Sequence, residues 1–423
     1  MLDNFGYTGE LQHMELVDYE SDILIVGGGL AGMPLALALS QGGLSVTLVD
    51  ALDPATATGA GFDGRVSAVA FSSCRMLRQL GVIEHLAGQM QPINDIVVSD
   101  GRVRGPSSSF FLHFDHTEIG DEPLGHLIEN RHMRIALQKA VGETAGIRMI
   151  APNAVIKIEY GAHVLATLKD GTRVKARVAF AADGRNSPTR EAAGLKTIGW
   201  DYGQTGIVTT VEHERPHEGV AQEYFLPGGP FAILPMVGNR ASLVWTERHE
   251  SARTILALDD AAFADEMRAR FGDYLGDCKP VGPRWSYPLS LQLARDYVRP
   301  RLALVGDAAH AIHPIAGQGL NLGWRDVAAA AQVTIEAARL GQDIGALDVL
   351  ERYQQWRRFD NVSLSLLMDG MNRLFSNDIA PLRLVRDIGM GLVNLTGPAR
   401  RLFMRHAGGS VGDLPRLLRG EPI

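Results

Sequence analysis

Three glycines near the start of the chain have the spacing of a dinucleotide-binding turn. Gly27, Gly29 and Gly32 follow the apolar run at 23–26 and open a segment with a helical pattern. In such a turn the first glycine permits the tight bend, the second lets the backbone approach a pyrophosphate, and the third lets helix and strand pack closely. The helix N-terminus then offers free N–H groups and the positive end of its dipole to the phosphates.

An acidic residue completes this pattern. Asp50 ends the next predicted strand, where its carboxylate can accept hydrogen bonds from an adenosine ribose. The alternative is a buried strand–helix–strand unit whose glycines are incidental. The candidate cofactor contacts in this stretch are Gly27, Gly28, Gly29, Leu30, Ala31, Gly32 and Asp50.

A second glycine-rich turn occurs late in the chain, between a predicted strand from Leu302 and a predicted helix over 320–340. Gly317 and Gly319 flank Gln318, so backbone N–H groups there can come close to a flat or anionic ligand. The helix directs the positive end of its dipole toward the same place. This arrangement suits a flavin, because the reduced ring becomes anionic around N1 and the C2 carbonyl, and fixed N–H donors would stabilise that charge.

Two histidines flank this second turn. His310 and His313 would need a third ligand nearby to hold a metal ion, and the sequence offers none. His310 is therefore expected to cap or to pack, and His313 is a candidate proton carrier.

Two arginines and one acidic turn are further candidates. Arg65, one loop after the nucleotide strand, could reach back to a cofactor or substrate, and the alternative is an exposed surface arginine. Arg131 lies near the start of a helix predicted over 128–141. A later apolar run predicts a strand that delivers Asp183 and Gly184 to a turn.

These residues need a larger framework to position them. A length of 423 residues predicts two or three structural units. Residues 53–64 are typical of a loop and residues 66–80 of a helix, whereas 200–248 changes to period-two strands joined by Pro/Gly turns. That region predicts an antiparallel sheet inserted into an α/β framework, where it could form a wall of a substrate cavity. Its aromatic residues are either core or ligand contacts: Tyr224, Phe225, Phe231 and Trp245.

Composition narrows the classes of function and compartment. A net charge of −7 without a long basic run argues against nucleic acid as a partner. Cys74 and Cys278 form no metal or redox motif, which favours a reducing, cytoplasmic compartment. Residues 2–20 are polar and acidic, unlike a secretory signal. The apolar stretch 23–39 is short for a membrane span and contains four glycines.

Residues 350–423 have a mostly helical pattern and are basic. As an amphipathic segment, this part of the chain could lie on a membrane surface. The alternative is an ordinary helix packed on the main body or on a partner subunit. The arginines concerned are Arg357, Arg358, Arg373, Arg383, Arg386, Arg400, Arg401 and Arg405.

Three separated motifs give the chain a specific resemblance. GGGLAG, AADGRNSPTR and GDAAHAIHPIAGQGLNLGWRD resemble, in order and spacing, the single-component FAD aromatic hydroxylases of the para-hydroxybenzoate hydroxylase type. Within that superfamily the chain resembles the ubiquinone-biosynthesis hydroxylases, on DGR at 63–65, on GPFAILPM with SLVW, and on GDLPRLLRG in the tail. Asp50 departs from the glutamate more usual there, but it can still reach a ribose.

The resemblance implies an α/β fold with a Rossmann-like FAD-binding domain, an inserted antiparallel β-sheet substrate domain and a helical C-terminal segment. The expected boundaries are 1–20 for a flexible N-terminal extension, 21–75, 100–195 and 285–350 for the FAD-binding domain, 76–99 and 196–284 for the substrate domain, and 351–423 for the C-terminal segment.

The resemblance also implies roles for the candidate residues. Gly27–Gly32 and Asp50 would hold the ADP half of FAD, and Arg65 and Arg131 would contact flavin or phosphate. Asp183 with Gly184 resembles a motif linked to FAD and to transient pyridine nucleotide binding. The implied contacts of the ribityl chain and the isoalloxazine ring are Asp307 for the chain, and Pro314, Gly317, Gln318, Gly319, Leu320 and Asn321 for the ring.

The implied activity is hydroxylation of the aromatic ring of a polyprenylated phenol in ubiquinone biosynthesis, through a flavin C4a-hydroperoxide. FAD is the implied cofactor, O₂ the co-substrate and NAD(P)H the expected electron donor. So apolar a substrate implies contact with the inner face of a membrane or with other enzymes of the pathway. No side chain is identified as a catalytic base.

Three other classes of function are weighed against this one. A two-nucleotide dehydrogenase or disulfide reductase would normally carry a second G-x-G-x-x-G, which is absent from the sequence. A related FAD enzyme, such as another hydroxylase, a halogenase or a prenyl reductase, is the second class. A non-enzymatic binding or assembly subunit is the third, and the intact late glycine turn argues against it.

Overall fold

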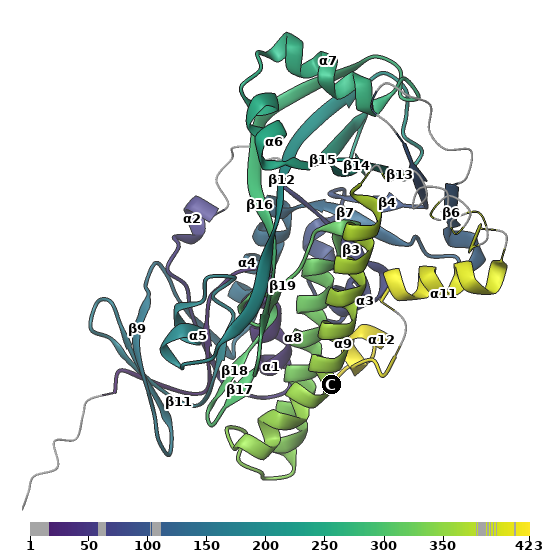
Figure 1. Cartoon of the computed structure of the whole chain (residues 1–423). Coiled ribbons are helices and arrows are strands. Elements are labelled where there is room, and N and C mark those ends of the chain that lie inside the picture. Colours follow the sequence, from purple (N-terminus) through teal and green to yellow (C-terminus); the bar gives the residue numbers. More distant parts are fainter. Residues whose placement is uncertain are drawn as a thin grey trace, which may run out of the picture.

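The computed structural model describes residues 17–57, 65–101, 103, 111–377, 379, 386, 389, 391, 393–394, 396–409 and 412–423. In this part of the chain, two eight-stranded sheets and one three-stranded sheet are surrounded by helices (Figure 1). The expected extension over 1–20 lies mostly outside the described residues, and strand β1 (Tyr19–Val26) already begins at Tyr19. Asp63 and Gly64 also lie outside them.

The first sheet is parallel at its centre and contains the strands that lead into the glycine turns. Its other strands are β2 (Val46–Val49), β8 (Ile147–Ile150), β9 (Val155–Tyr160), β10 (Val164–Leu168), β11 (Arg173–Ala181), β17 (Val298–Arg299) and β18 (Leu302–Leu304). The order is β17–β18–β11–β1–β2–β8, with the hairpin β9–β10 attached to β11. Helix α1 (Gly32–Gln41) connects β1 to β2, as the glycine pattern predicts. β2 is buried throughout, as expected of a parallel strand covered on both faces.

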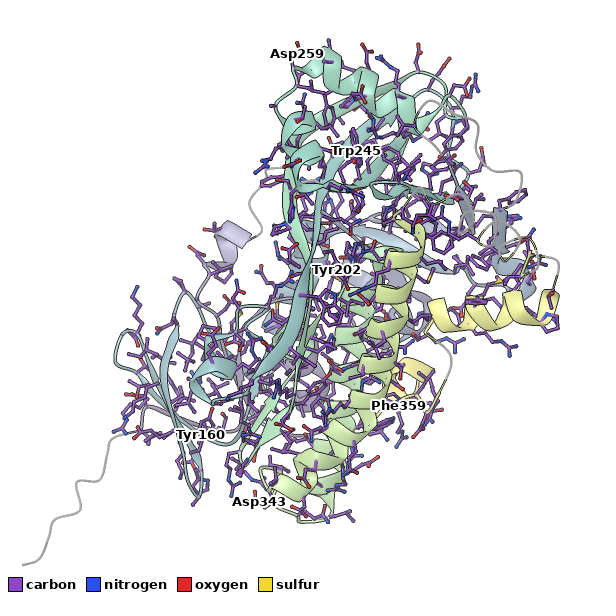
Figure 2. The ribbon with its side chains drawn as sticks, viewed as in Figure 1. Tyr160, Tyr202, Trp245, Asp259, Asp343 and Phe359 are labelled. Atoms are coloured by element: carbon purple, nitrogen blue, oxygen red, sulfur yellow. The ribbon has the colours of Figure 1, made fainter. Side chains whose placement is uncertain are left out.

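The second sheet is the inserted antiparallel sheet that the sequence predicts over 200–248. Its strands are β5 (Asp95–Asp100), β6 (Phe111–Asp115), β12 (Thr197–His213), β13 (Val220–Leu226), β14 (Gly229–Met236), β15 (Arg240–Arg248), β16 (Cys278–Ala294) and β19 (His310–Ala311). The order is β19–β16–β12–β15–β14–β13–β5–β6, and among these described strands only β13 and β5 pair in parallel. β6 belongs to this sheet, although the expected boundaries assigned it to the FAD-binding domain. Helices α6 (His249–Leu256) and α7 (Asp260–Phe271) cover its upper end around a core that includes Trp245 (Figures 1 and 2).

A three-stranded sheet packs against the second sheet and against helix α8 (Gln318–Arg339). Its order is β3 (Val66–Ala70), β7 (Gly125–Glu129), β4 (Met90–Ile93). The prediction of a helix over 66–80 is wrong at its start, because VSAVA pairs with β7 as a strand and helix α3 (Phe71–Gln79) begins only after it. Helix α4 (Asn130–Glu143) likewise begins two residues later than predicted, since β7 continues to Glu129.

The C-terminal residues are helical, and part of them belongs to the core. Helix α9 (Leu347–Phe375) runs along α8 and reaches the second sheet (Figure 1). Its Tyr353 is 1% exposed and donates its hydroxyl to the Leu304 carbonyl at 2.7 Å. Helix α11 (Gly397–Ala407) lies near β6, and α12 (Arg416–Arg419) packs on α3 and α8. No helix of the described residues is long and apolar enough to cross a bilayer.

The C-terminal arginines do not form one exposed basic surface. Arg357 and Arg386 are 1% and 3% exposed, and they pair with the buried carboxylates of Asp326 and Asp100. Arg383 lies outside the described residues. The C-terminal segment is therefore in part a structural component of the main body. Among the eight arginines singled out in this segment, the exposed ones are Arg358, Arg373, Arg401 and Arg405.

Candidate functional site

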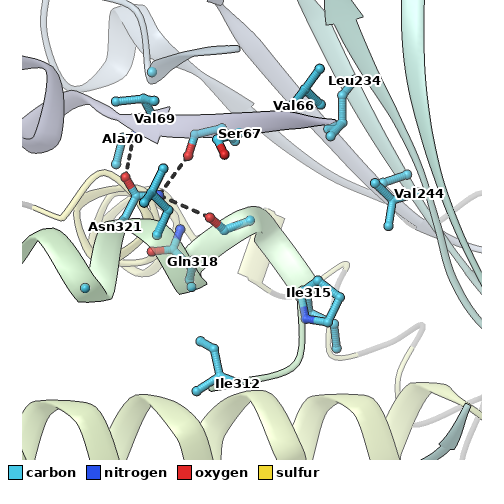
Figure 3. A pocket seen from close by; sticks show the side chains of 18 of the residues that line it. Val66, Ser67, Val69, Ala70, Leu234, Val244, Ile312, Ile315, Gln318 and Asn321 are labelled. Atoms are coloured by element: carbon cyan, nitrogen blue, oxygen red, sulfur yellow. Dashed lines mark hydrogen bonds between the residues drawn. The ribbon is translucent and has the colours of Figure 1, made fainter. Parts of the chain in front are cut away.

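The two glycine turns, far apart in the sequence, lie on one cavity of about 660 Å³ (Figure 3). Its walls come from the turns after β1, β11 and β18, from β3, from the second sheet and from the first turn of α8. The carboxyl ends of parallel strands are where open α/β sheets bind ligands. The sequence-predicted residues that line the cavity are Gly29, Leu30, Ala31, Gly184, Asp307, Pro314, Gly317, Gln318, Gly319, Leu320 and Asn321.

The first turn has the close contacts that the glycine fingerprint requires. Gly27 has a φ of +106°, and a side chain there would collide with the Ala182 carbonyl. A Cβ on Gly32 would lie 1.8 Å from the Gly27 carbonyl oxygen, so only glycine lets α1 start this close to the strand. A Cβ on Gly29 would meet no protein atom within 4 Å, because this residue faces the cavity.

Asp50 lies behind this turn rather than in the cavity wall. Its Oδ2 accepts a hydrogen bond from the Gly28 N–H at 2.5 Å, and its Oδ1 accepts one from the Leu52 N–H at 2.7 Å. An ionised carboxylate can accept about four hydrogen bonds. Asp50 therefore holds the turn and keeps capacity for the hydroxyls of a ribose.

Two helix N-termini open onto the cavity without a side-chain cap from their own N-cap residues. The N-cap residues Ala31 of α1 and Gly317 of α8 provide no side-chain hydrogen bond, and neither helix has an acidic residue in its first turn. The first N–H groups of a helix lack partners within the helix. Two such ends on one cavity fit a long ligand that is anionic at one end and presents carbonyl or anionic ring atoms at the other, as FAD does.

Asn321 fixes the second turn against β3. Its Oδ1 accepts from the Ala70 N–H at 2.8 Å, and its Nδ2 donates to the carbonyls of Ala68 and Gly317 at 2.8 and 3.2 Å (Figure 3). Asn321 is 3% exposed. Its side chain therefore positions the glycine turn, while the backbone of the turn remains available to a ligand.

Asp307 projects into the cavity from the turn after β18. Its carboxylate is accessible from the cavity but enclosed by protein, and this desolvation raises its pKa, with His310 and Arg185 opposing the shift. Gly306 before it has a φ of +62°, which lets the chain bend sharply at this point.

A buried ionic cluster supports this turn from behind. Asp326 on α8 is 0% exposed and accepts hydrogen bonds from the Gly306 N–H at 3.2 Å, from His310 Nε2 at 2.5 Å and from Arg357 Nε at 3.0 Å. Asn361 donates to the same carboxylate at 3.0 Å. The prediction that His310 caps or packs is consistent with this contact. The cluster joins α8, α9 and the turn that carries the cavity carboxylate.

His313 is held neutral, and its Nε2 is buried without a hydrogen-bond partner among the described residues. Its Nδ1 accepts from the Ile315 N–H at 3.3 Å, so the ring proton is on Nε2. Burial lowers the pKa of His313 to about 4, with Asp369 opposing the shift. A general acid or base works best with a pKa near the operating pH. These observations oppose the hypothesis that His313 carries protons near neutral pH.

Arg65 and Arg131 do not line the cavity. The Arg65 carbonyl accepts from the Asn130 N–H at 2.9 Å. Arg131 Nε donates to Glu129 at 2.8 Å, and that carboxylate also pairs with Arg240 at 3.2 Å. Both arginines therefore flank the three-stranded sheet outside the cavity.

Two other arginines line the cavity, and sequence reasoning missed them. Arg134 follows Arg131 by three positions on the same helix, so helical spacing could have indicated it. Arg185 directly follows Gly184 and donates to the Ser290 carbonyl at 3.0 Å.

The turn at Asp183 is tied to the turn at Asp307 by a third, buried arginine. Arg190 is 3% exposed and donates to the carbonyls of Arg185 and Ala308, both at 2.9 Å. Asp183 Oδ2 accepts from the Thr189 N–H at 3.0 Å, and its Oδ1 is buried without a partner among the described residues. The AADGRNSPTR motif thus positions the cavity edge, and three of its residues line the cavity: Ala182, Gly184 and Arg185.

The rest of the cavity is mostly apolar and comes mainly from the three-stranded and second sheets, which also contribute the polar residues Ser67, Gln222, Glu223 and Thr246. The aromatic residues that the sequence offered as alternative ligand contacts do not line it, and Phe225, Phe231 and Trp245 are core residues at 1%, 0% and 0% exposure. The apolar lining includes Val66, Ala68, Ile93, Ile96, Phe114, Leu124, Ala221, Ala232, Leu234, Val244 and Met404.

Sequence relatives give the site its context. The family model described as FAD binding domain matches residues 20–358. Ubiquinone hydroxylase UbiL of Rhodospirillum rubrum is 50% identical over 412 residues, which cover 96% of this chain and 94% of that protein. The 3-demethoxyubiquinol 3-hydroxylase of Escherichia coli is 33% identical over 395 residues, which cover 93% of this chain and 99% of that protein.

Solved structures share the fold at lower identity. The p-nitrophenol 4-monooxygenase PnpA from Pseudomonas putida is 18% identical with a TM-score of 0.76, covering 93% of this chain and 99% of that one. The flavin-dependent brominase Bmp2 is 18% identical with a TM-score of 0.73, covering 95% of this chain and 97% of that one. Because a hydroxylase and a brominase share it, the fold alone does not select a reaction. The sequence relatives narrow the assignment further. The chain belongs to the FAD binding domain family and, within it, to the FAD-dependent monooxygenases of the ubiquinone-biosynthesis hydroxylase family.

Proposed function

We propose that this chain hydroxylates the aromatic ring of a polyprenylated phenol on the way to ubiquinone, with FAD as its cofactor, O₂ as co-substrate and NAD(P)H as electron donor. The observation that carries the proposal is a single cavity with two chemically different halves. One half presents the N-termini of α1 and α8, whose N-cap residues give no side-chain hydrogen bond, and the other half is mostly apolar. The names of the two sequence relatives give the substrate class.

In this proposal the first half of the cavity holds FAD. Gly27–Gly32 and Asp50 hold the ADP part, and Asp307 accepts hydrogen bonds from the ribityl chain. The turn from Pro314 to Asn321 would hold the isoalloxazine ring. Arg65 and Arg131 flank the three-stranded sheet outside the cavity lining, and their contact with flavin or phosphate stays a prediction. Asp183 acts through the turn that it caps.

When bound and reduced, FAD supplies the activated oxygen, so the protein needs few reactive side chains. The first N–H groups of α8 stabilise negative charge on the reduced ring. Apolar residues such as Ile96, Leu234 and Val244 orient the substrate ring and exclude water that would divert the oxygen to peroxide. We assign no catalytic base.

A surface of α9 supports a peripheral contact with the inner, cytoplasmic face of a membrane. A prenyl tail is too apolar to diffuse freely through water, so the enzyme must meet its substrate at a bilayer or in a complex of pathway enzymes. α9 exposes Phe359 (Figure 2) by 77% and Leu366 by 55%, and the exposed Arg358 and Arg373 are on the same helix. Lys/Arg near such a face favour anionic lipids.

The membrane contact is tested with point variants, because deleting 350–423 would also remove Arg357 from the core. We expect the double variant Phe359→Ser/Leu366→Ser to lose most of its sedimentation with anionic liposomes while keeping its flavin. Arg268→Ser, on the exposed side of α7, is the control. Equal sedimentation of both variants and the wild type would remove this part of the proposal.

The main proposal is tested on the purified protein. We expect a yellow protein with FAD released on denaturation, and we expect a prenylated phenol to gain one oxygen when the reduced protein meets air. Mass spectrometry of the extracted phenol gives the result. A flavin-free protein that cannot be reconstituted, or a flavin-loaded protein that leaves every prenylated phenol unchanged, would overturn it.

A further inference from the structure

One face of α11 points into the molecule, as the burial of its residues shows. Met404 is 2% exposed, whereas its neighbour Phe403 is 47% exposed. Arg400 and Met404 lie four positions apart on one side of this helix, and Gly408, directly after its end, donates its N–H to the Met404 carbonyl at 2.8 Å. The sequence offered two alternatives for this basic segment, a membrane surface or packing on the main body, and at Met404 the side chain packs inward.

This inner face reaches the cavity. Met404 and Gly408 both belong to the cavity lining. The Gly408 carbonyl accepts from the Ser72 N–H at 3.2 Å, two residues after Ala70, which also lines the cavity. α11 therefore closes the cavity where β3 passes into α3.

Contacts at both ends hold α11 in this place. At its N-terminal end, Arg400 makes two hydrogen bonds to Glu118, from Nε at 3.0 Å and from Nη2 at 2.8 Å. Such a two-point contact fixes direction as well as distance. At the other end, the backbone of Gly408 and Gly409 approaches Ser72 so closely that a Cβ on Gly409 would lie 2.3 Å from its hydroxyl. Met404 lies between these two anchors.

We propose that α11 is a wall of the substrate cavity and that Met404 is a specificity-determining residue. In this inference, which rests on the proposed function, Met404 contacts the apolar part of the prenylated phenol. The residues matched by the shared FAD-binding model end at 358, so this wall comes from a part of the chain outside that model. The sequence of a helix outside the shared FAD-binding domain can differ between enzymes that bind the same cofactor. A methionine side chain is unbranched, polarisable and without strong polar groups, and it adapts to an apolar ligand.

The test measures binding of the substrate to the FAD-loaded protein. A prenylated phenol is titrated in mild detergent, and the change in flavin absorbance gives Kd. Met404→Ala removes apolar contact at the wall and is expected to raise Kd about tenfold. Met404→Gln keeps the length but adds a polar amide that an apolar ligand cannot satisfy, and it is expected to raise Kd by at least as much.

The neighbouring exposed residue provides the matched control. Phe403→Ala truncates a larger side chain on the same helix, but outside the cavity, and is expected to leave Kd within about twofold. Flavin content and unfolding temperature are measured for all three variants, so a general loss of folding is recognised. Glu118→Gln, which weakens one anchor of α11 without changing the cavity lining, is expected to raise Kd by an intermediate factor.

The outcomes separate the inference from the proposed function. If the wild type binds and hydroxylates the phenol, and both Met404 variants bind it as the Phe403 control does, the inference is overturned and the proposed function stands. If Met404→Ala does not fold, the same comparison with Met404→Gln decides. If the flavin-loaded wild type neither binds nor hydroxylates any prenylated phenol, both are overturned.

Discussion

Replacing Arg357 will destabilise the protein far more than replacing an exposed arginine. Its guanidinium donates to Asp326 at 3.0 Å, to Asn361 at 2.8 Å and to Asp360 at 2.7 Å. Burial alone would raise the pKa of Asp326, but His310 and Arg357 hold this pKa below its usual value. The carboxylate therefore stays ionised in the interior and depends on its cationic and hydrogen-bonding neighbours.

The size of the effect follows from the burial of both partners. Arg357→Met keeps an unbranched side chain but removes the charge and its hydrogen bonds. Removing one partner of a buried pair costs about 3–5 kcal/mol, because the other charge remains buried without compensation. His310 and Asn361 still contact Asp326 in the variant, so we expect about 3 kcal/mol, at the lower end of that range.

The assay is equilibrium unfolding in urea at pH 7, followed by circular dichroism and by flavin fluorescence. Coincident transitions of the two probes justify a single free energy of unfolding. Arg268→Met is the control, since Arg268 pairs with Asp265 and their side chains are 52% and 71% exposed. Exposed ion pairs contribute about 0–1 kcal/mol to the free energy of unfolding. If both variants lose the same free energy of unfolding, and less than about 1 kcal/mol, the reasoning that the buried pair holds α9 to the cavity turn is refuted.

Two further predictions concern His313 and the first glycine turn. The folded-state pKa of His313, about 4, is below the ordinary 6.5, so the unfolded chain binds the proton first. The stability contributed by the neutral ring is complete above pH 6.5 and is lost as the pH falls toward 4. We expect the wild type to lose about 2–3 kcal/mol more than His313→Asn between pH 7 and 4, measured by urea unfolding, and parallel curves would contradict this. Gly29→Ala should leave the flavin-free protein within about 0.5 kcal/mol of wild-type stability but reduce FAD affinity about tenfold, because its Cβ would meet no protein atom and would enter the cavity. Gly32→Ala should instead destabilise the fold by several kcal/mol, since its Cβ would overlap the Gly27 carbonyl; similar unfolding curves for the two variants would argue against this division of roles.

Sequence reasoning located the cavity because the two glycine turns carry local signals. Gly27, Gly29 and Gly32 have fixed tasks within one strand–turn–helix unit, so their spacing alone predicts the unit. Gly317 and Gly319 similarly mark the start of α8. In both places the conformation depends on near neighbours in the chain, and the prediction of an α/β fold with an inserted antiparallel sheet is confirmed.

Local sequence patterns do not decide the structure where residues distant in the sequence determine the contacts. The segment 66–70 is a strand only because it pairs with β7, which local periodicity does not reveal. Arg131 and Arg134 share a helix, and the rotation of that helix against the sheets decides that only Arg134 reaches the cavity. Arg357 belongs to a basic stretch by sequence, but it is buried because Asp326 on α8 lies opposite.

The central claim is that one cavity brings FAD and an apolar phenol together so that an oxygen atom passes to the ring. The most direct measurement is a single turnover of the reduced, FAD-loaded protein with a prenylated phenol under ¹⁸O₂, followed by mass spectrometry of the product. We predict one ¹⁸O atom in the new hydroxyl group. A product whose new oxygen comes from water, or consumption of oxygen with release of peroxide alone, would contradict the claim.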